Sequence, residues 1–277
     1  GDDVFIVDIG AGSSNNLRSW NIDFGGINAV LLTHLHSDHI SDLPNLHQAA
    51  WIMENRTDKL KVYGPEGVSQ VTDGFEMAYD LDYGFRSKHH GEAVAPRKYA
   101  GFNANVIDLD EPVFFDNGDL KITAFKVIHE PIEPALGYKF EYKGRSLVIS
   151  GDTSYSENVI KASEGVDVLF HEAQANHMVD IIENFALENG AKLRAKLLAD
   201  IKTYHTTLIE AADIANKADV KKLVFYHLTP APRNYLTELM FVRGVNEVRK
   251  NWVLSEDGTM IVLPVESDQI IVDTMQN

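Results

Sequence analysis

Cysteine is absent from the 277 residues of the chain, which excludes disulfide bonds and thiolate metal ligands. The same absence does not separate an oxidising from a reducing compartment, so a cytoplasmic and a periplasmic location both stay open. Long apolar runs are missing as well, and no signal peptide is visible at the start of the sequence. We therefore expect no membrane attachment, and the localisation stays unassigned.

Positive charge is scarce, since 25 lysine and arginine residues stand against 41 aspartate and glutamate residues and give a net charge of −16. Such a chain repels a polyanion such as RNA unless a local basic face is built for it. The largest local group of basic residues is expected in a loop over residues 86–98 that could contact a small anionic group: Arg86, Lys88, His89, His90, Arg97 and Lys98. The charge therefore predicts that nucleic acid is not a partner.

Against these absences stands a run of metal-binding side chains, T-H-L-H-S-D-H, at residues 33–39. Histidines and an aspartate at this density serve neither a hydrophobic core nor a solvated face. Neutral imidazole and carboxylate are ligands that zinc and similar divalent ions take in proteins. The run therefore predicts a metal site, and a histidine-rich surface loop without a ligand role is the alternative.

The surroundings of this run predict a turn between a strand and a helix. The apolar, β-prone residues 28–32 precede the run, and a helix start follows it at Ser-Asp-Leu-Pro. Where the chain is extended, residues two apart point to the same side, so His34 and His36 can hold one ion together. Asp38 and His39 follow the bend and face elsewhere. This geometry predicts two adjacent ions.

Three further candidate ligands lie at the ends of probable strands. His129 ends one strand-like segment, Asp152 follows a second within S-G-D-T, and His227 follows a third. Open α/β folds place their chemistry at the carboxyl ends of strands. A structural role is the alternative for each residue taken singly, and the metal-binding run favours ligand roles for all three.

These motifs resemble those of the metallo-β-lactamase superfamily of binuclear metal hydrolases, in particular its tRNase Z and arylsulfatase-like branch. The matching segments are H-x-H-x-D-H at 34–39, His129, S-G-D-T at 150–153, H-E-A at 171–173, Y-H-T-T at 204–207 and Y-H-L-T-P at 226–230. The resemblance extends from Val4 to about Arg249. It implies an α/β fold of the metallo-β-lactamase type, an αββα four-layer sandwich.

The resemblance also implies a ligand set and a division of roles. The first ion would be bound by His34, His36 and His129, the second by Asp38, His39 and His227, and Asp152 would bridge them. The cofactors would be two Zn²⁺ ions, with Mn²⁺ or Fe²⁺ as substitutes. Asp8 would orient the ligands from behind. Catalysis is assigned to Asp38, His205 and Glu172, with His205 as general acid and Glu172 as its hydrogen-bonded partner.

The chemistry expected from this set is hydrolysis of a small ester by a hydroxide that bridges two ions. A locally positive metal site attracts a small anion, and H-L-T-P at 227–230 is more similar to the arylsulfatase-like members. We therefore expect a small anionic or neutral ester as substrate, most of all a sulfate ester or phosphodiester. A tRNA 3′-processing endonuclease and a carboxylic ester or lactone hydrolase are the alternatives, although no Gly- or Lys-rich arm for tRNA is evident.

Two other classes of function are disfavoured. An oxidoreductase of the same fold would hold iron, but the diiron flavoproteins have a glutamate at the position of His36 and carry an additional flavodoxin domain. A purely structural use of the metals would be indicated by a defective ligand set. No ligand is missing from the motifs, so the pattern favours an enzyme.

Length and pattern predict one domain over residues 1–277. Strands are expected near Val4, Ala29, Lys61, Asn105, Leu120, Tyr138, Leu147, Val168, Leu223 and Met260, and helices at 43–55, 66–79, 155–163, 178–202, 207–218 and 234–250. The first β-hairpin of the family is missing before the strand that leads to Asp8. We therefore expect that the native N-terminus is not visible in this sequence.

An apolar stripe marks residues 178–202, which are interrupted by Asn189-Gly190. The spacing of its large side chains is helical. Core packing is the expected role of most of the stripe. A homodimer contact or a lid over the active site is the alternative.

Overall fold

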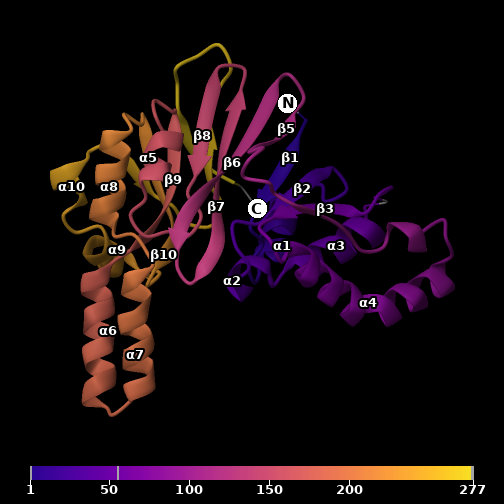
Figure 1. Cartoon of the computed structure of the whole chain (residues 1–277), viewed down its shortest axis with the longest axis horizontal. Coiled ribbons are helices and arrows are strands. Elements are labelled where there is room, and N and C mark those ends of the chain that lie inside the picture. The colour runs from indigo at the N-terminus through magenta and orange to yellow at the C-terminus, as the bar shows by residue number, and fades with distance from the viewer. Residues whose placement is uncertain (1, 55, 276–277) are drawn as a thin grey trace. The chain divides into compact units, whose positions relative to one another are not determined.

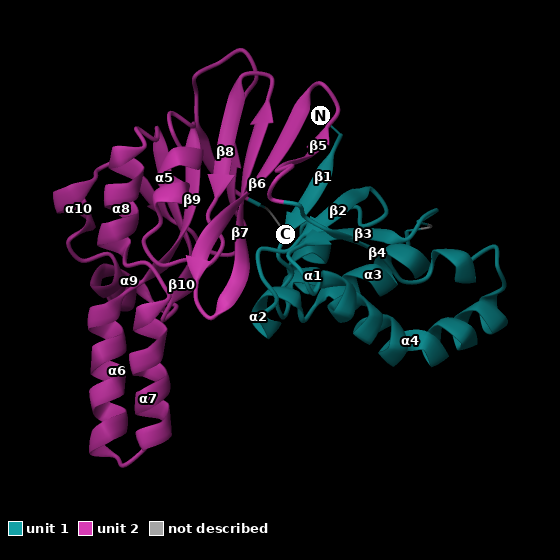
Figure 2. Cartoon of the chain, in the orientation of Figure 1, with its two compact units in different colours: residues 1–108, 275–277 teal, residues 109–274 magenta. Residues whose placement is uncertain are grey.

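The computed structural model describes residues 2–54 and 56–275, which fold into two compact units. Unit 1 spans residues 1–108 with 275–277, and unit 2 spans residues 109–274 (Figure 2). Each unit contains its own sheet, its own helices and its own hydrophobic core. The prediction of one domain over the whole chain stays a prediction, and the mixed α/β character that the sequence predicts is confirmed in both units.

Unit 1 is built on a parallel sheet in which strand follows strand in chain order. Its strands are β1 (Val4–Val7), β2 (Ile27–Leu31), β3 (Leu60–Gly64) and β4 (Phe102–Val106), in the order β1-β2-β3-β4. The helices that connect them are α1 (Ser13–Ser19), α2 (Ser37–Ile40), α3 (Leu43–Ile52) and α4 (Val68–His90), with the short 3₁₀ helix Arg97–Tyr99 before β4. Parallel strands need such crossover connections, which return the chain to the same edge.

The core of unit 1 lies between the sheet and α3. Val30 and Leu32 from β2 and the following turn pack with Leu43 and Leu46 of α3, and all four are fully buried. Burying side chains of this size stabilises the unit by about 1.5–3 kcal/mol each. This packing fixes the turn between β2 and α3, where the metal-binding run lies.

Unit 2 is built on a seven-stranded mixed sheet in the order β11-β10-β9-β8-β7-β6-β5. Its strands are β5 (Val113–Asp116), β6 (Leu120–His129), β7 (Ile132–Tyr142), β8 (Arg145–Ile149), β9 (Val168–Gln174), β10 (Lys222–Thr229) and β11 (Trp252–Leu254). The neighbours from β8 to β11 are parallel, whereas β5, β6, β7 and β8 are joined as antiparallel hairpins. A separate hairpin pairs β12 (Thr259–Val262) with β13 (Ile271–Thr274).

The helices of unit 2 divide into those that pack on the sheet and a pair that extends from it. The helices are α5 (Glu157–Ala162), α6 (Asn176–Glu188), α7 (Lys192–Asp200), α8 (Leu208–Lys217), α9 (Tyr235–Phe241) and α10 (Val245–Val248), with a 3₁₀ turn at Ile201–Thr203. Helix α8 buries Ala211, Ala212 and Ala215 in the core and begins with a capping box between Thr207 and Glu210. Helices α6 and α7 pack against each other and extend away from the sheet (Figure 1).

The sequence-based strands and most helices are confirmed, but several segments differ from expectation, among them α1, β11 and β13, which were not expected. Residues 86–98 are not one continuous loop, because α4 continues to His90 and a 3₁₀ helix spans Arg97–Tyr99. The helical pattern is sustained there by ion pairs on the exposed face, such as Arg86 with Asp82. The sequence between Asn105 and Leu120 also contains a strand, β5, that was not expected.

The apolar stripe on residues 178–202 is likewise not core packing as expected. Its residues form α6 and α7, and Phe185 is 65% exposed, Leu193 87% and Leu197 59%. The buried residues of α6 and α7 are Val179, near the start of α6, and the small Ala186 and Ala195. Helical spacing predicted the helices correctly, but the spacing alone does not say which face another element covers.

The length and hydropathy of a helix decide whether it can span a membrane. Within residues 2–54 and 56–275, none of the helices is both long enough and apolar enough to cross a lipid bilayer.

One buried histidine makes the stability of unit 1 sensitive to pH. The backbone N–H of Gly101 donates to Nε2 of His47 over 2.8 Å, and burial, with the charges of Arg56 and Lys59, lowers the pKa of His47 from 6.5 to about 3. Between these values the unfolded chain takes up a proton and the folded chain does not. The free energy of unfolding should therefore fall as the pH drops through this window, by up to about 1.4 kcal/mol per pH unit.

Urea unfolding at pH 7 and pH 5 tests this expectation in the wild type and in His47→Gln. The variant keeps a hydrogen-bond acceptor for Gly101 but has no proton to take up, so its stability should depend less on pH. Equal pH dependence in the two proteins would show that His47 is not the group responsible.

Candidate metal and catalytic site

Unit 1 places Asp8 and Thr33 at one edge of its sheet. Asp8 follows β1 and Thr33 follows β2, and the two strands are parallel neighbours, so their carboxyl ends meet. The Asp8 carboxylate accepts three hydrogen bonds: from Thr33 N, from Thr33 Oγ1 and from Nδ1 of His39, at 2.7, 2.7 and 2.8 Å. Asp8 therefore ties the end of β2 to the helical turn that carries His39.

The hydrogen bond between His39 and Asp8 fixes the tautomer of His39. Because Nδ1 of His39 donates to Asp8, the lone pair of the neutral ring lies on Nε2. A carboxylate behind an imidazole is the arrangement that orients metal-ligating histidines and makes them more basic. His34 has an equivalent partner, since its Nδ1 lies 3.1 Å from the hydroxyl of Thr33. The outer contacts of unit 1 therefore fit a metal-binding role.

The ligand candidates of unit 1 lie close together after β2, and the ring centres of His34 and His39 are 4.0 Å apart. Nε2 of His34 lies 2.9 Å from Nδ1 of His36, so these two rings present nitrogens to one place. His36 has extended backbone and caps α2, where the chain bends. Asp38 and His39 lie on that helical turn, with Asp38 Oδ2 3.8 Å from His39 Nε2.

The backbone around Asp8 is shaped by close approach to this turn. Asp8 adopts a left-handed conformation with φ of 56°, which is uncommon for a residue with a side chain and is concentrated at functional sites. At Gly10 a Cβ atom would lie 2.1 Å from the carbonyl oxygen of Asp38. Only glycine fits there, so Gly10 allows the loop after β1 to pack directly on the metal-binding run.

Unit 2 gathers its candidates at one edge of the seven-stranded sheet. Strands β8, β9 and β10 are parallel, and β6 has the same direction because two antiparallel pairings separate it from β8. Their carboxyl ends carry His129 on β6, Asp152 after β8, Glu172 on β9 and His227 on β10. Four segments far apart in the sequence thus deliver titratable side chains to one place.

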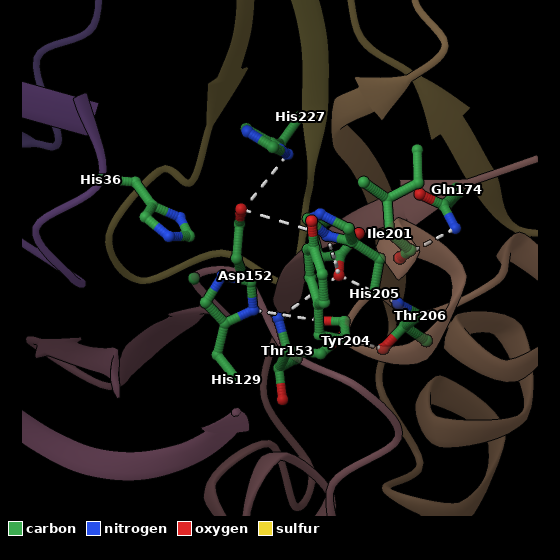
Figure 3. A network of polar contacts seen from close by, with 12 residues as sticks. His36, His129, Asp152, Thr153, Gln174, Ile201, Tyr204, His205, Thr206 and His227 are labelled. Atoms are coloured by element: carbon green, nitrogen blue, oxygen red, sulfur yellow. Dashed lines mark hydrogen bonds and ion pairs between the residues drawn. The ribbon is translucent and has the colours of Figure 1, made fainter. Parts of the chain in front are cut away.

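Asp152 and His227 form a group with metal-ligand spacing together with His205. Nδ1 of His227 lies 3.3 Å from Oδ1 of Asp152, and Nδ1 of His205 lies 4.0 Å from Oδ2 of Asp152. Figure 3 shows both rings directed at the Asp152 carboxylate. Two imidazoles around a buried carboxylate make a donor set that suits zinc, manganese or iron. His205, expected only as an acid, therefore lies close enough to Asp152 to share an ion with it.

His227 reaches this place through a bulge in β10. The pairing of β10 with β9 shifts between Tyr226 and Leu228, and His227 has a φ of 47°. A bulge redirects one side chain relative to the regular alternation of a strand, and such bulges are frequent beside active sites. Strand periodicity in the sequence cannot reveal this redirection.

His129 has its tautomer set by the backbone. The carbonyl oxygen of Tyr204 lies 3.0 Å from Nδ1 of His129 and accepts its proton, so Nε2 carries the lone pair. Tyr204 precedes His205, and this contact connects the β6 end to the segment that holds the predicted acid. Sequence analysis did not identify this role for Tyr204, because a backbone contact leaves no signature in the sequence.

The predicted pair of Glu172 and His205 lies within hydrogen-bond distance. Oε1 of Glu172 is 3.1 Å from Nδ1 of His205, and the same oxygen accepts from the backbone N–H of Thr206 at 2.9 Å and of Thr153 at 3.3 Å. Burial and the nearby carboxylate of Asp152 raise the pKa of Glu172, and the two N–H groups oppose this shift. The two amide donors, at Thr153 and Thr206, are functional contacts that the sequence motifs did not specify.

Each unit thus carries part of the predicted ligand set. His34, His36, Asp38 and His39 belong to unit 1, and His129, Asp152 and His227 belong to unit 2. The tautomers fixed on His39 and His129 and the donor types present fit divalent transition ions.

Most of the chain is similar in sequence to one protein family and to relatives of known name. Residues 7–228 of the chain match the model of a protein family that is described as "Beta-lactamase superfamily domain". Ribonuclease Z of Mycobacterium marinum is 32% identical over 83% of this chain and 78% of the relative, and ribonuclease Z of Mycobacterium bovis is 30% identical with the same coverage. The matched region includes every predicted ligand.

Solved structures support the fold. The metallo-β-lactamase fold protein YhfI of Bacillus subtilis matches with a TM-score of 0.62 and 19% identity, over 90% of this chain and 83% of its own. The short form of human tRNase Z matches with a TM-score of 0.59 and 23% identity, over 91% and 85%. The prediction of a metallo-β-lactamase fold is confirmed.

The prediction that nucleic acid is not a partner is wrong in view of these relatives, because they are named as ribonucleases. The error has a physical cause. A net charge of −16 describes the whole chain, whereas substrate binding depends on the local field at the site, where bound cations and oriented amides contribute most.

Proposed function

We propose that this chain, which belongs to the β-lactamase superfamily of metal-dependent hydrolases, cleaves phosphodiester bonds in RNA at the 3′ side of tRNA precursors. The observation that carries the proposal is the 32% identity to a ribonuclease Z over 83% of the chain. The contacts within each unit support it, because they are those that hydrolysis with bound metal ions requires.

The proposal assigns the metal ligands to both units. His34, His36, Asp38 and His39 would act with His129, Asp152 and His227 to hold two divalent ions. The four donors of unit 1 and the three donors of unit 2 together make up the ligand set that the motifs predict. The bound ions would supply Lewis acidity and an acidified water at neutral pH.

The chain's own contribution to the leaving group comes from His205. Its Nδ1 faces Glu172, so the proton that it donates is on Nε2. Transfer of that proton to the departing ribose oxygen completes the cleavage. Glu172 acts as a positioning residue: it holds the ring in one orientation, and the amides of Thr153 and Thr206 hold Glu172.

Hydrolysis of a small sulfate ester or phosphodiester is the second candidate function. The H-L-T-P segment at 227–230 favours it, because this segment is more similar to the arylsulfatase-like members. The same metal centre and the same acid would serve this reaction, so the two candidates differ in substrate binding.

A cleavage assay on a tRNA precursor with a 3′ trailer distinguishes the candidates. The purified protein with added zinc or manganese should release the trailer, and the rate should decline steeply between about 50 and 200 mM salt, since phosphate contacts are screened. Parallel assays use bis-p-nitrophenyl phosphate, p-nitrophenyl sulfate and p-nitrophenyl acetate. Efficient hydrolysis of the sulfate ester without any cleavage of the RNA would reject the RNA proposal and favour the second candidate.

A further inference from the structure

A polar cavity of about 450 Å³ lies entirely within unit 1 and is separate from the predicted metal ligands. Helices α1 and α3 and the last turns of α4 contribute its walls. Its size lies in the range of small-molecule sites. None of its lining residues has a role in the proposed hydrolysis, so the cavity calls for an explanation of its own.

The inner wall of the cavity contains two buried polar atoms that lack a partner. Ser14 is only 4% exposed, and its hydroxyl contacts no hydrogen-bonding group among residues 2–54 and 56–275. Gln48 donates through Nε2 to Asp82 at 2.9 Å, which leaves its buried Oε1 without a donor in the same described part of the chain. A buried polar group without a partner is destabilising, so a ligand that pairs with it would be stabilised.

The neighbouring carboxylate in this wall is already satisfied. Asp42 accepts a hydrogen bond from Ser14 N at 2.6 Å and another from Nδ2 of Asn45 at 2.5 Å. Its charge is therefore partly compensated by donors of the protein. The hydroxyl of Ser14 and the amide oxygen of Gln48 remain as the groups that a ligand can address.

One side of the cavity is apolar. Ala49, Ile52 and Met53 come from the end of α3, and Met53 is 64% exposed. A flexible thioether and an aliphatic side chain form a surface that suits a flat ring. The cavity thus combines an apolar side with a polar floor.

Two arginines complete the lining. Arg18 comes from α1, where its guanidinium lies 5.6 Å from the ring centre of Phe24, and Arg86 comes from α4, where its Nε donates to Asp82 at 2.7 Å. Guanidinium groups bind phosphate with two parallel hydrogen bonds, and Arg86 uses only one of its nitrogens for Asp82 in this ion pair. The lining therefore offers positive charge for a phosphate.

We propose that this cavity binds a ribonucleotide. The base packs on Ile52 and Met53 and pairs at its edge with Gln48 and Ser14, and the phosphate lies between Arg18 and Arg86. The same chemistry is present in a free nucleotide and in an unpaired residue of an RNA strand. The inference goes beyond the proposed hydrolysis, because the binding needs neither a metal ion nor cleavage.

Isothermal titration of the intact protein with AMP, adenosine and inorganic phosphate tests the inference directly. AMP should bind with at least about tenfold higher affinity than either of its parts, because only AMP uses both the apolar side and the arginines. Arg18→Ala and Arg86→Ala should each weaken AMP binding by about tenfold, and Ser14→Ala should weaken it by a smaller factor. Lys88→Ala, an equal loss of charge on the exposed side of α4, is the matched control and should leave binding unchanged.

The alternatives give different results in the same titrations. Equal affinity for phosphate and AMP would show an anion site without a base pocket and would overturn the proposal. Absence of AMP binding, or binding that Arg18→Ala, Arg86→Ala and Ser14→Ala all leave unchanged, would overturn it as well. A single-stranded RNA oligonucleotide that competes with AMP identifies the strand as the natural source, and a lack of competition identifies the free nucleotide. Because the readout is binding, these outcomes are independent of whether the protein cleaves RNA.

Discussion

Asp152→Ala is expected to lower phosphodiester hydrolysis by about a thousandfold or more and to reduce the content of bound metal. Asp152 is 2% exposed, and its carboxylate lies 3.3 Å from His227 and 4.0 Å from His205, so its removal leaves these rings without their central anion. Metal ions stabilise the transition state by several kcal/mol, and each 1.36 kcal/mol corresponds to a factor of ten in rate. His36→Ala in unit 1 should have an effect of the same kind.

Rates on bis-p-nitrophenyl phosphate and elemental analysis of the purified variants provide the measurement. Asp119→Ala is a suitable control, since it removes an exposed carboxylate of unit 2 that lies 2.9 Å from Nζ of the surface residue Lys143. The control should retain both activity and metal. If Asp152→Ala kept the full rate while binding no metal, the assignment of this carboxylate would be wrong.

His205→Ala is expected to slow hydrolysis by a factor that depends on the leaving group. A general acid contributes about 10²–10⁴ in rate when the departing oxygen needs a proton. A ribose oxygen needs it and a p-nitrophenolate hardly does, so RNA cleavage should lose far more than hydrolysis of the chromogenic ester. Glu172→Gln should show the same pattern more weakly, because Glu172 acts through the ring at 3.1 Å.

The comparison between the two substrates separates this role from damage to the fold. His89→Ala, at the exposed end of α4, is the matched histidine control and should affect neither substrate. An equal loss on both substrates would place His205 among the metal ligands, a role that its 4.0 Å distance from Asp152 also allows. It would contradict the acid assignment.

The candidate ligands could be picked out from the sequence because metal binding requires rare residue types at fixed spacing, and their binding of metal stays a prediction. The run from His34 to His39 specifies both the turn and its ligands, and the positions of Asp152 and His227 follow from strand ends. Parallel strands of one sheet bring their carboxyl ends together, so this part of the site is fixed by topology.

Other features could not be predicted, and for physical reasons. The bulge that redirects His227 and the Tyr204 carbonyl that orients His129 are backbone contacts without a sequence signature. The exposed side chains of α6 and α7, such as Phe185, were expected in the core. Helical periodicity shows that one face of a helix is apolar, but it does not show whether another element packs on that face. The prediction that nucleic acid is not a partner failed because the net charge of the whole chain does not describe the local field at a binding site.

Metal stoichiometry tests the central claim most directly. Elemental analysis of the protein purified without chelators and supplied with zinc should find about two ions per chain, and a ligand variant in either unit, His36→Ala or Asp152→Ala, should lower that number. Such a result would show that ligands from both units hold the bound metal. A protein that binds no transition ion, or variants that keep the full complement, would contradict the account.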